Sequence, residues 1–202
     1  MTTQITNNDV KNYLLRVYFG PLRHDPVRKA VNRAYRDFNR TLRGFSSLTD
    51  GESIRTEAHE YLENALAELI SKAAPMSQSE FDSWHERTCV QLSSLYGDFK
   101  FHVGQAQKWI NMAIKYIFVI DRTLIDPQWA CCHVPIDQIL LQQLRQAGHT
   151  PPRFGKPWSR ISCYSSYLAF QKWFRAEFDG IPMDVEFGLW MGTPEDTSYA
   201  AN

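Results

Sequence analysis

The stretch FHVGQAQKWINMAIKYIFVI occupies residues 101–120 and decides the fold. Its apolar residues recur every three or four positions, which predicts a helix over about residues 105–120. The stretch HVPIDQILL at residues 133–141 predicts a further helix that begins near Ile136. The two helices place Lys108 early in the first and Asp137 at the start of the second.

Helical spacing continues outward through most of the chain, and no run alternates convincingly with period two. A capping box, Ser77-x-x-Glu80, marks one helix start. Helices are also predicted over about residues 8–18, 26–44, 52–72, 77–95, 162–178 and 183–191. We therefore expect an all-α protein, a single-domain helical bundle of about eight helices over residues 1–202. Residues 1–95 supply N-terminal helices with a basic face, and residues 96–192 supply the remaining helices, which carry Lys108 and Asp137. The tail after Thr193 is expected to fray.

Composition limits the class of protein. Hydrophobic residues make up 44% of the chain and aromatic residues 13%, as expected of a globular protein. Lys+Arg and Asp+Glu both number 22, so the overall charge gives no support for nucleic-acid binding. No apolar run is long enough to cross a bilayer, and the N-terminus resembles no secretory signal. We expect a cytoplasmic protein without a membrane partner.

The four cysteines do not follow the spacing of a zinc site, because Cys131 and Cys132 are adjacent. Reduced thiols are the simpler interpretation, and we expect neither a metal nor another cofactor.

Charge is unevenly distributed along the chain. Residues 21–43 contain seven Lys and Arg but only two Asp. Five of these basic residues recur every three or four positions and share one helical face. This basic stripe consists of Lys29, Arg33, Arg36, Arg40 and Arg43. A solvated helix face usually mixes both signs more evenly, so the stripe is a candidate for phosphate contact.

Lys108 and Asp137 each have an ordinary interpretation and a chemical one. A surface lysine can cover Trp109 with its stem, whereas a buried one with a depressed pKa is a nucleophile. Lys115, seven residues later, is a second candidate on the same face. Asp137 is a good N-cap residue, and its carboxylate can also stabilise positive charge that develops on a sugar.

Taken together, Val103-Gly104, Lys108 and Pro135-Ile136-Asp137 resemble the helix-hairpin-helix DNA glycosylase superfamily. In that family a Val-Gly hairpin precedes the catalytic lysine, and a Pro-Val-Asp-type segment supplies the catalytic aspartate. The lysine-to-aspartate spacing is similar to that of the archaeal 8-oxoguanine DNA glycosylase branch. The segment IPMDVEFGLW at residues 181–190 resembles that branch's base-binding segment.

The resemblance implies a DNA glycosylase with abasic-site lyase activity. It also implies that residues 96–192 form a helix-hairpin-helix-like element, the catalytic lysine and aspartate, and base-pocket helices. Lys108 would attack the sugar while Asp137 stabilises the transition state. Contacts with the extruded base are expected from Glu186, Trp190 and Trp109. Contacts with the DNA backbone are expected from Val103, Gly104, Lys29, Arg33, Arg36 and Arg40.

The family pattern is not matched throughout. The hairpin lacks the usual Gly-x-Gly arrangement, and Glu186 stands where the branch has Asp.

Two alternatives remain open at this point. The same helical scaffold could bind nucleic acid without catalysis. It could also serve protein interactions, with core or interface aromatics at Trp84, Trp129, Trp158 and Trp173. A ribonuclease toxin with an Arg-x4–6-His motif is disfavoured, because no arginine has a histidine at that spacing.

Overall fold

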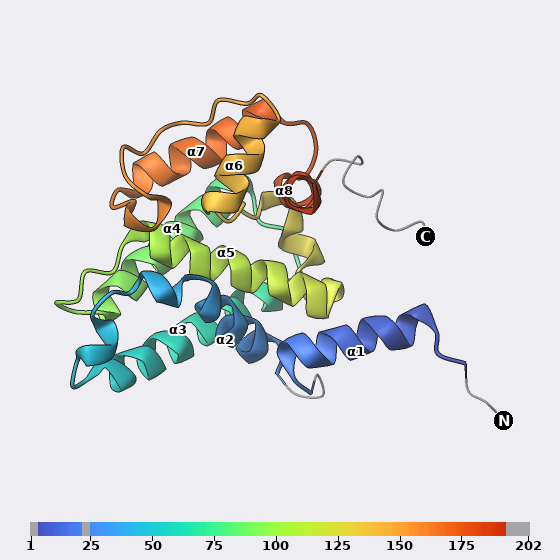
Figure 1. The fold of residues 1–202 in the computed structure, drawn as a ribbon, viewed down its shortest axis with the longest axis horizontal. Helices are drawn as coiled ribbons and strands as arrows, with labels where there is room; N and C mark the ends of the chain where they lie inside the picture. Colours follow the sequence, from blue (N-terminus) through green and yellow to red (C-terminus); the bar gives the residue numbers. More distant parts are fainter. Residues whose placement is uncertain (1–3, 22–24, 193–202) are drawn as a thin grey trace.

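A computed structural model describes residues 4–21 and 25–192 of the chain. Within these residues the protein is all-helical, and no strand is formed (Figure 1). The α-helices are α1 (Asn7–Phe19), α2 (Pro26–Phe38), α3 (Gly51–Ser71), α4 (Gln78–Leu95), α5 (Val103–Ile120), α6 (Gln138–Gln146), α7 (Tyr164–Glu177) and α8 (Pro182–Met191). Short 3₁₀ helices are η1 (Asn39–Thr41), η2 (Phe45–Ser47), η3 (Arg122–Leu124), η4 (Asp126–Cys131) and η5 (Trp158–Arg160). The predicted fold class is confirmed.

Helix α5 is the centre of the bundle. Every residue from Gly104 to Ile117 is buried, so this helix is covered on all sides. Helix α2 packs most extensively against it, and α4, α7 and η5 also contact it. Figure 1 shows α2 and α3 towards one side of α5, and α6, α7 and α8 towards the other. A central helix of this kind brings its polar residues into contact with several distant segments.

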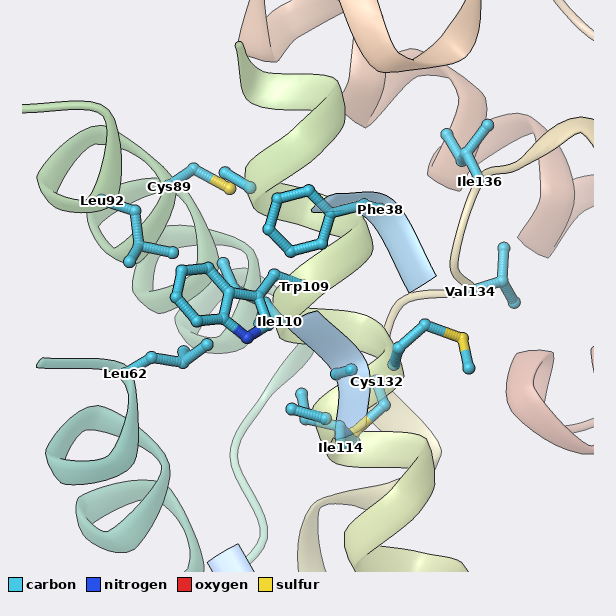
Figure 2. Packing of buried hydrophobic residues seen from close by; sticks show 14 of the residues in the cluster. Phe38, Leu62, Cys89, Leu92, Trp109, Ile110, Ile114, Cys132, Val134 and Ile136 are labelled. Carbon is cyan, nitrogen blue, oxygen red and sulfur yellow. The ribbon is translucent and has the colours of Figure 1, made fainter. Parts of the chain in front are cut away.

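The hydrophobic core surrounds α5. Figure 2 shows Trp109 beside Phe38 and Leu62, with Val134 and Ile136 on another side of the helix. The indole Nε1 of Trp109 donates a hydrogen bond to the carbonyl of Val31 over 3.0 Å, which satisfies its buried polar atom. Burial of side chains of this size supplies most of the driving force for folding.

Most helix ends lie within two residues of those predicted, but α2 ends at Phe38 and not near Gly44. The chain turns through η1, and Leu42 and Phe45 then both reach the core. Gly44 has φ +85°, a left-handed conformation that glycine adopts without strain.

Helix α1 projects from the rest of the molecule (Figure 1). It contains no buried residue, although Val10, Tyr13, Leu14 and Val17 are apolar or aromatic and largely exposed. Among the helices that the structure describes, none is long and apolar enough to span a membrane. The predicted fraying after Thr193 lies outside the described residues.

Candidate functional site

Lys108 and Asp137 lie in direct contact. Lys108 Nζ donates a hydrogen bond to Asp137 Oδ2 over 2.6 Å. The side chains are 6% and 14% exposed, so the pair is largely desolvated but reachable at the carboxylate. Asp137 is also the N-cap of α6, because its Oδ1 accepts the N–H of Leu140 over 2.8 Å. One carboxylate thus caps a helix and holds the ammonium.

Gln107 fixes the spacing of this pair. Its side-chain amide accepts the N–H of Ile136 over 3.0 Å and donates to the carbonyl of Ile136 over 2.8 Å. This two-point contact fastens the residue before Asp137 to the residue before Lys108. The hydrogen bonds between Gln107 and Ile136 therefore help to set the distance between Lys108 Nζ and Asp137 Oδ2, in addition to the attraction between the two charges.

A second amide contact holds the same segment from the other side. Gln171 of α7 accepts the N–H of Val134 over 3.0 Å and donates to its carbonyl over 2.9 Å. Asn111 of α5 donates to that carbonyl over 3.2 Å. Residues 134–136 thus pair with side-chain amides instead of a neighbouring strand, which satisfies backbone groups buried in the core.

His133 continues this buried polar network. Its Nε2 lies 2.8 Å from Asp82 Oδ1, and its Nδ1 lies 2.8 Å from the Tyr167 hydroxyl. Burial lowers the pKa of His133, and it lowers that of His85 well below its usual value. Burial therefore favours the neutral form of both imidazoles, which act as hydrogen-bonding groups.

Gly104 has a packing role at the start of α5. A Cβ atom at this position would come within 1.9 Å of the Trp158 carbonyl oxygen, so only glycine fits. The N–H of Gly104 donates to the carbonyl of Ile161 over 2.9 Å. Because this donor is occupied, the prediction that Gly104 grips a DNA phosphate through its backbone N–H is not supported. Val103 lies beside it, half-buried against the core.

A large cationic hollow opens at the N-terminal end of α5. This hollow, the α5 groove, has a volume of about 930 Å³, and no Asp or Glu is among its lining residues. Its basic lining consists of Arg40, Arg43, Lys100, His102, Lys156 and Arg160. Burial and the nearby charges of Lys100, Arg160 and Lys156 lower the pKa of His102. Positive potential without an internal counter-charge is typical of a site for phosphate groups.

The basic stripe predicted along one helix is divided by the turn after Phe38. Arg40 joins the α5 groove, whereas Lys29, Arg33 and Arg36 line a separate hollow of about 320 Å³ beside α1. Arg33 is already engaged, because its guanidinium pairs with Asp37 at 3.2 Å and covers the ring of Tyr18 at 4.0 Å. Arg40 and Arg36 are exposed and available to an anionic ligand.

Lys115 forms a second buried ion pair, with Glu186 of α8. The two side chains are 8% and 2% exposed. Lys115 Nζ also lies 4.1 Å from the ring centre of Phe187 and 5.8 Å from that of Trp190. Burial lowers the pKa of Lys115 and raises that of Glu186. Glu186, predicted to bind a base, is occupied by Lys115 in this conformation.

The other two predicted base contacts differ in exposure. Trp190 is 51% exposed, and its ring is accessible to a ligand. Trp109 has no exposed surface and packs beside Phe38 in the core, so a contact between Trp109 and substrate is not supported.

Several residues of the site were not predicted from the sequence. Gln107 and Asn111 could have been noticed, because each is an amide on a helix otherwise rich in apolar residues. Arg43 was noted only as part of the stripe. Lys100, Lys156 and Arg160 carried no signal, since they are far apart in the chain and meet only in the fold.

No group suited to a metal occurs among the described His, Cys, Asp and Glu residues. The thiols of Cys131 and Cys132 are buried, and each donates to the carbonyl of Gln128, at 3.0 and 3.2 Å. Their adjacency therefore has a structural explanation.

Comparisons with protein-family models, with curated proteins and with solved structures give no significant match to this chain.

Proposed function

We propose that this protein is a DNA glycosylase with associated abasic-site lyase activity, which removes an oxidised or otherwise modified base. The observation that carries the proposal is the largely desolvated contact between Lys108 Nζ and Asp137 Oδ2 at 2.6 Å. A lysine held against a carboxylate, on a helix whose N-terminal end lines a cationic groove, would provide a nucleophile, a charge stabiliser and a means of binding DNA.

In the proposed mechanism, the ammonium of Lys108 first gives a proton to Asp137, which lies within hydrogen-bonding distance. The free amine attacks the anomeric carbon of the sugar, and the bond to the base breaks as the base departs with the electron pair and takes the proton from Asp137, which is then a carboxylate again. One proton passes from the attached nitrogen to the ring oxygen, and opening of the sugar ring leaves a protonated Schiff base between Nζ and the sugar. The Asp137 carboxylate then accepts a proton from the adjacent carbon, and the 3′ phosphate is expelled with the electron pair, which cuts the strand.

Asp137 has two roles in this scheme. It accepts the proton of Lys108, and as a carboxylate it then stabilises the positive charge that develops on the sugar. Its position is fixed, because Oδ1 caps α6. Gln107 keeps Ile136, and with it Asp137, beside the lysine. Such preorganisation is what a site of this kind requires, because misplacement by about 1 Å can cost about 100-fold in rate.

The α5 groove would hold the DNA backbone through Arg40, Arg43 and Lys100. These contacts are independent of sequence and orient the duplex without selecting a base. The half-exposed ring of Trp190 is the candidate surface on which an extruded base stacks. Its neighbour Glu186 supports this surface by holding Lys115 beneath it.

The test is incubation with a panel of oligonucleotides that carry oxidised, alkylated, deaminated and bulky modified bases. Base release and strand nicking are scored separately, and borohydride is added to trap the Schiff base. We expect one class of lesion to give a trapped covalent complex, and we expect Lys108→Gln to abolish that complex.

Lys172→Gln is the matched control, because Lys172 is an exposed lysine on α7. It should trap as well as the wild type. If no modified base is released, or if Lys108→Gln still forms the trapped covalent complex, the enzyme proposal is wrong. Salt-dependent DNA binding without base release would instead favour a non-catalytic nucleic-acid-binding protein.

A further inference from the structure

A second groove, the α6 groove, lies along α6, the helix that Asp137 caps. It has a volume of about 550 Å³ and lies between α6 and the segment of residues 149–158. Gln138, which follows Asp137 directly, lines it on one side. Trp158 also lines it, and the Trp158 carbonyl packs against Gly104, one turn before Lys108. The groove therefore includes residues next to both members of the proposed reaction centre.

The α6 groove is cationic. Arg145, Arg153 and Lys156 line it and are exposed, and its lining residues include no Asp or Glu. His149 also lines it, and its Nδ1 lies 2.6 Å from the carboxylate of Glu177, which offsets any charge on the imidazole. Three cations with no carboxylate in the lining favour an anionic ligand with several charges.

The same groove differs from the α5 groove in its apolar surface. The half-buried rings of Phe154 and Trp158 line it, together with Pro151, Pro152 and Pro157. Phe154 is held from behind by Phe170, with ring centres 5.8 Å apart. Aromatic faces next to cations suit unpaired nucleotides, whose bases stack on rings, more than they suit a duplex, whose bases are already stacked.

Both grooves share the ridge formed by Gly155, Lys156 and Pro157. A strand held in the α5 groove by its phosphates can therefore continue over this ridge into the α6 groove. The ridge lysine, Lys156, faces both grooves and can contact a phosphate at the crossing.

We propose that the α6 groove binds an unpaired stretch of nucleic-acid strand next to the reacting nucleotide. Its phosphates would contact Arg145 and Arg153, and its bases would stack against Phe154 and Trp158. The identity of the reacting nucleotide rests on the proposed function, whereas binding of the strand in this groove requires no catalysis.

The experiment measures fluorescence anisotropy of the full chain with an unmodified, labelled single strand and with the same sequence as a duplex. Salt is varied from about 50 to 200 mM, because affinity that depends on phosphate contacts falls steeply over this range. We expect Arg145→Ala/Arg153→Ala to weaken single-strand binding by about 10-fold or more. The slope of log K against log salt should become shallower by about 1.4, or roughly 0.7 for each lost phosphate contact. Duplex binding should change by less than about 2-fold.

Arg16→Ala/Arg87→Ala is the matched control, since both arginines are exposed and neither lines the α6 groove. It removes the same charge and should leave single-strand binding unchanged. Phe154→Leu tests the aromatic contact and keeps an apolar side chain against Phe170. It should weaken single-strand binding by about 5-fold or more without changing the salt slope. Circular dichroism of each variant checks that the fold is kept.

The inference is overturned if the control loses as much affinity as Arg145→Ala/Arg153→Ala. It is also overturned if duplex and single-strand binding fall equally, or if neither falls. The two proposals fail separately. If the groove variants weaken strand binding but no base is released, the glycosylase proposal is wrong and the strand-binding proposal stands. If a base is released but the groove variants bind the strand as well as the wild type, the strand-binding proposal is wrong and the glycosylase proposal stands.

Discussion

Two lysines of α5 form buried ion pairs seven residues apart, and the surroundings of the two pairs differ. Lys108 meets Asp137 at the edge of the protein, where the carboxylate is 14% exposed and caps a helix. Lys115 meets Glu186, which is 2% exposed, with the ring of Phe187 4.1 Å from the ammonium. The charges of the first pair are near enough to influence the pKa values of both members of the second.

The difference teaches that a buried lysine–carboxylate contact does not by itself indicate catalysis. Burial of two charges is costly, and an ion pair in the interior often contributes little net stability. The first pair differs in two further respects, namely a partly exposed carboxylate and cationic grooves lined by residues near it in the chain, Gln105 and Gln138. The second pair is enclosed, and its expected role is to hold α8 against α5.

The largest expected effect is on stability at the second pair. Glu186→Ala should lower the free energy of unfolding by about 3–5 kcal/mol, because the ammonium of Lys115 is left buried without a partner. Replacement of both members, as Lys115→Met/Glu186→Leu, should restore stability to the wild-type level or above. Urea denaturation measures both variants. A loss below about 1 kcal/mol for Glu186→Ala would mean that the pair opens readily to water.

The next effect concerns base release and distinguishes the two carboxylates. Asp137→Asn should lower the single-turnover rate of base release at least about 100-fold, because the charge opposite Lys108 is removed. Asparagine is as good an N-cap as aspartate, so the start of α6 is preserved. Glu186→Gln should change the rate by less than about 10-fold. Equal losses in the two variants would assign chemistry to both pairs.

A smaller effect is expected from the amide contacts that position the first pair. Gln107→Leu leaves the buried N–H and carbonyl of Ile136 without this partner and should cost about 1–3 kcal/mol of stability. Gln171→Leu removes the corresponding amide from Val134, whose carbonyl keeps its hydrogen bond from Asn111; this matched control should cost the same or somewhat less. Only Gln107→Leu should also lower kcat for base release, by about 10-fold, with KM little changed. If both variants lower kcat equally, Gln107 has no special part in placing Asp137.

The smallest effect is the pH dependence of the second pair. Burial raises the pKa of Glu186, so its contribution to stability is present below the ordinary value of 4.5 and is lost as the pH rises through the raised pKa. Burial lowers the pKa of Lys115, so its contribution is present above 10.5 and is lost as the pH falls through the lowered pKa. The pair is therefore least favourable near neutral pH.

Denaturation between about pH 4.5 and 7 tests this dependence. The stability of the wild type relative to Lys115→Met/Glu186→Leu should fall as the pH rises, by at most about 1.4 kcal/mol per pH unit. A rise with pH would show that attraction within the pair outweighs the cost of burial.

Local patterns account for what could be predicted from the sequence. Apolar spacing and the Ser77-x-x-Glu80 capping box gave the helices of the structure, most of them to within two residues. The N-cap role of Asp137 is confirmed for the same reason, since a cap depends on the residues next to it. The bend after Phe38 was not predicted, because it depends on how Leu42 and Phe45 pack against core residues from distant segments.

Local sequence patterns were enough to predict the all-helical class, most helix positions and the candidate residues. The contact of Lys108 with Asp137, the pairing of Glu186 with Lys115, and the meeting of distant basic residues in the two grooves follow from the three-dimensional packing of the chain. The two kinds of feature differ in the sequence separation of the residues that interact. Helix formation depends on neighbours three and four residues away, whereas these contacts join residues 29 and 71 positions apart, and the packing of the whole core brings them together.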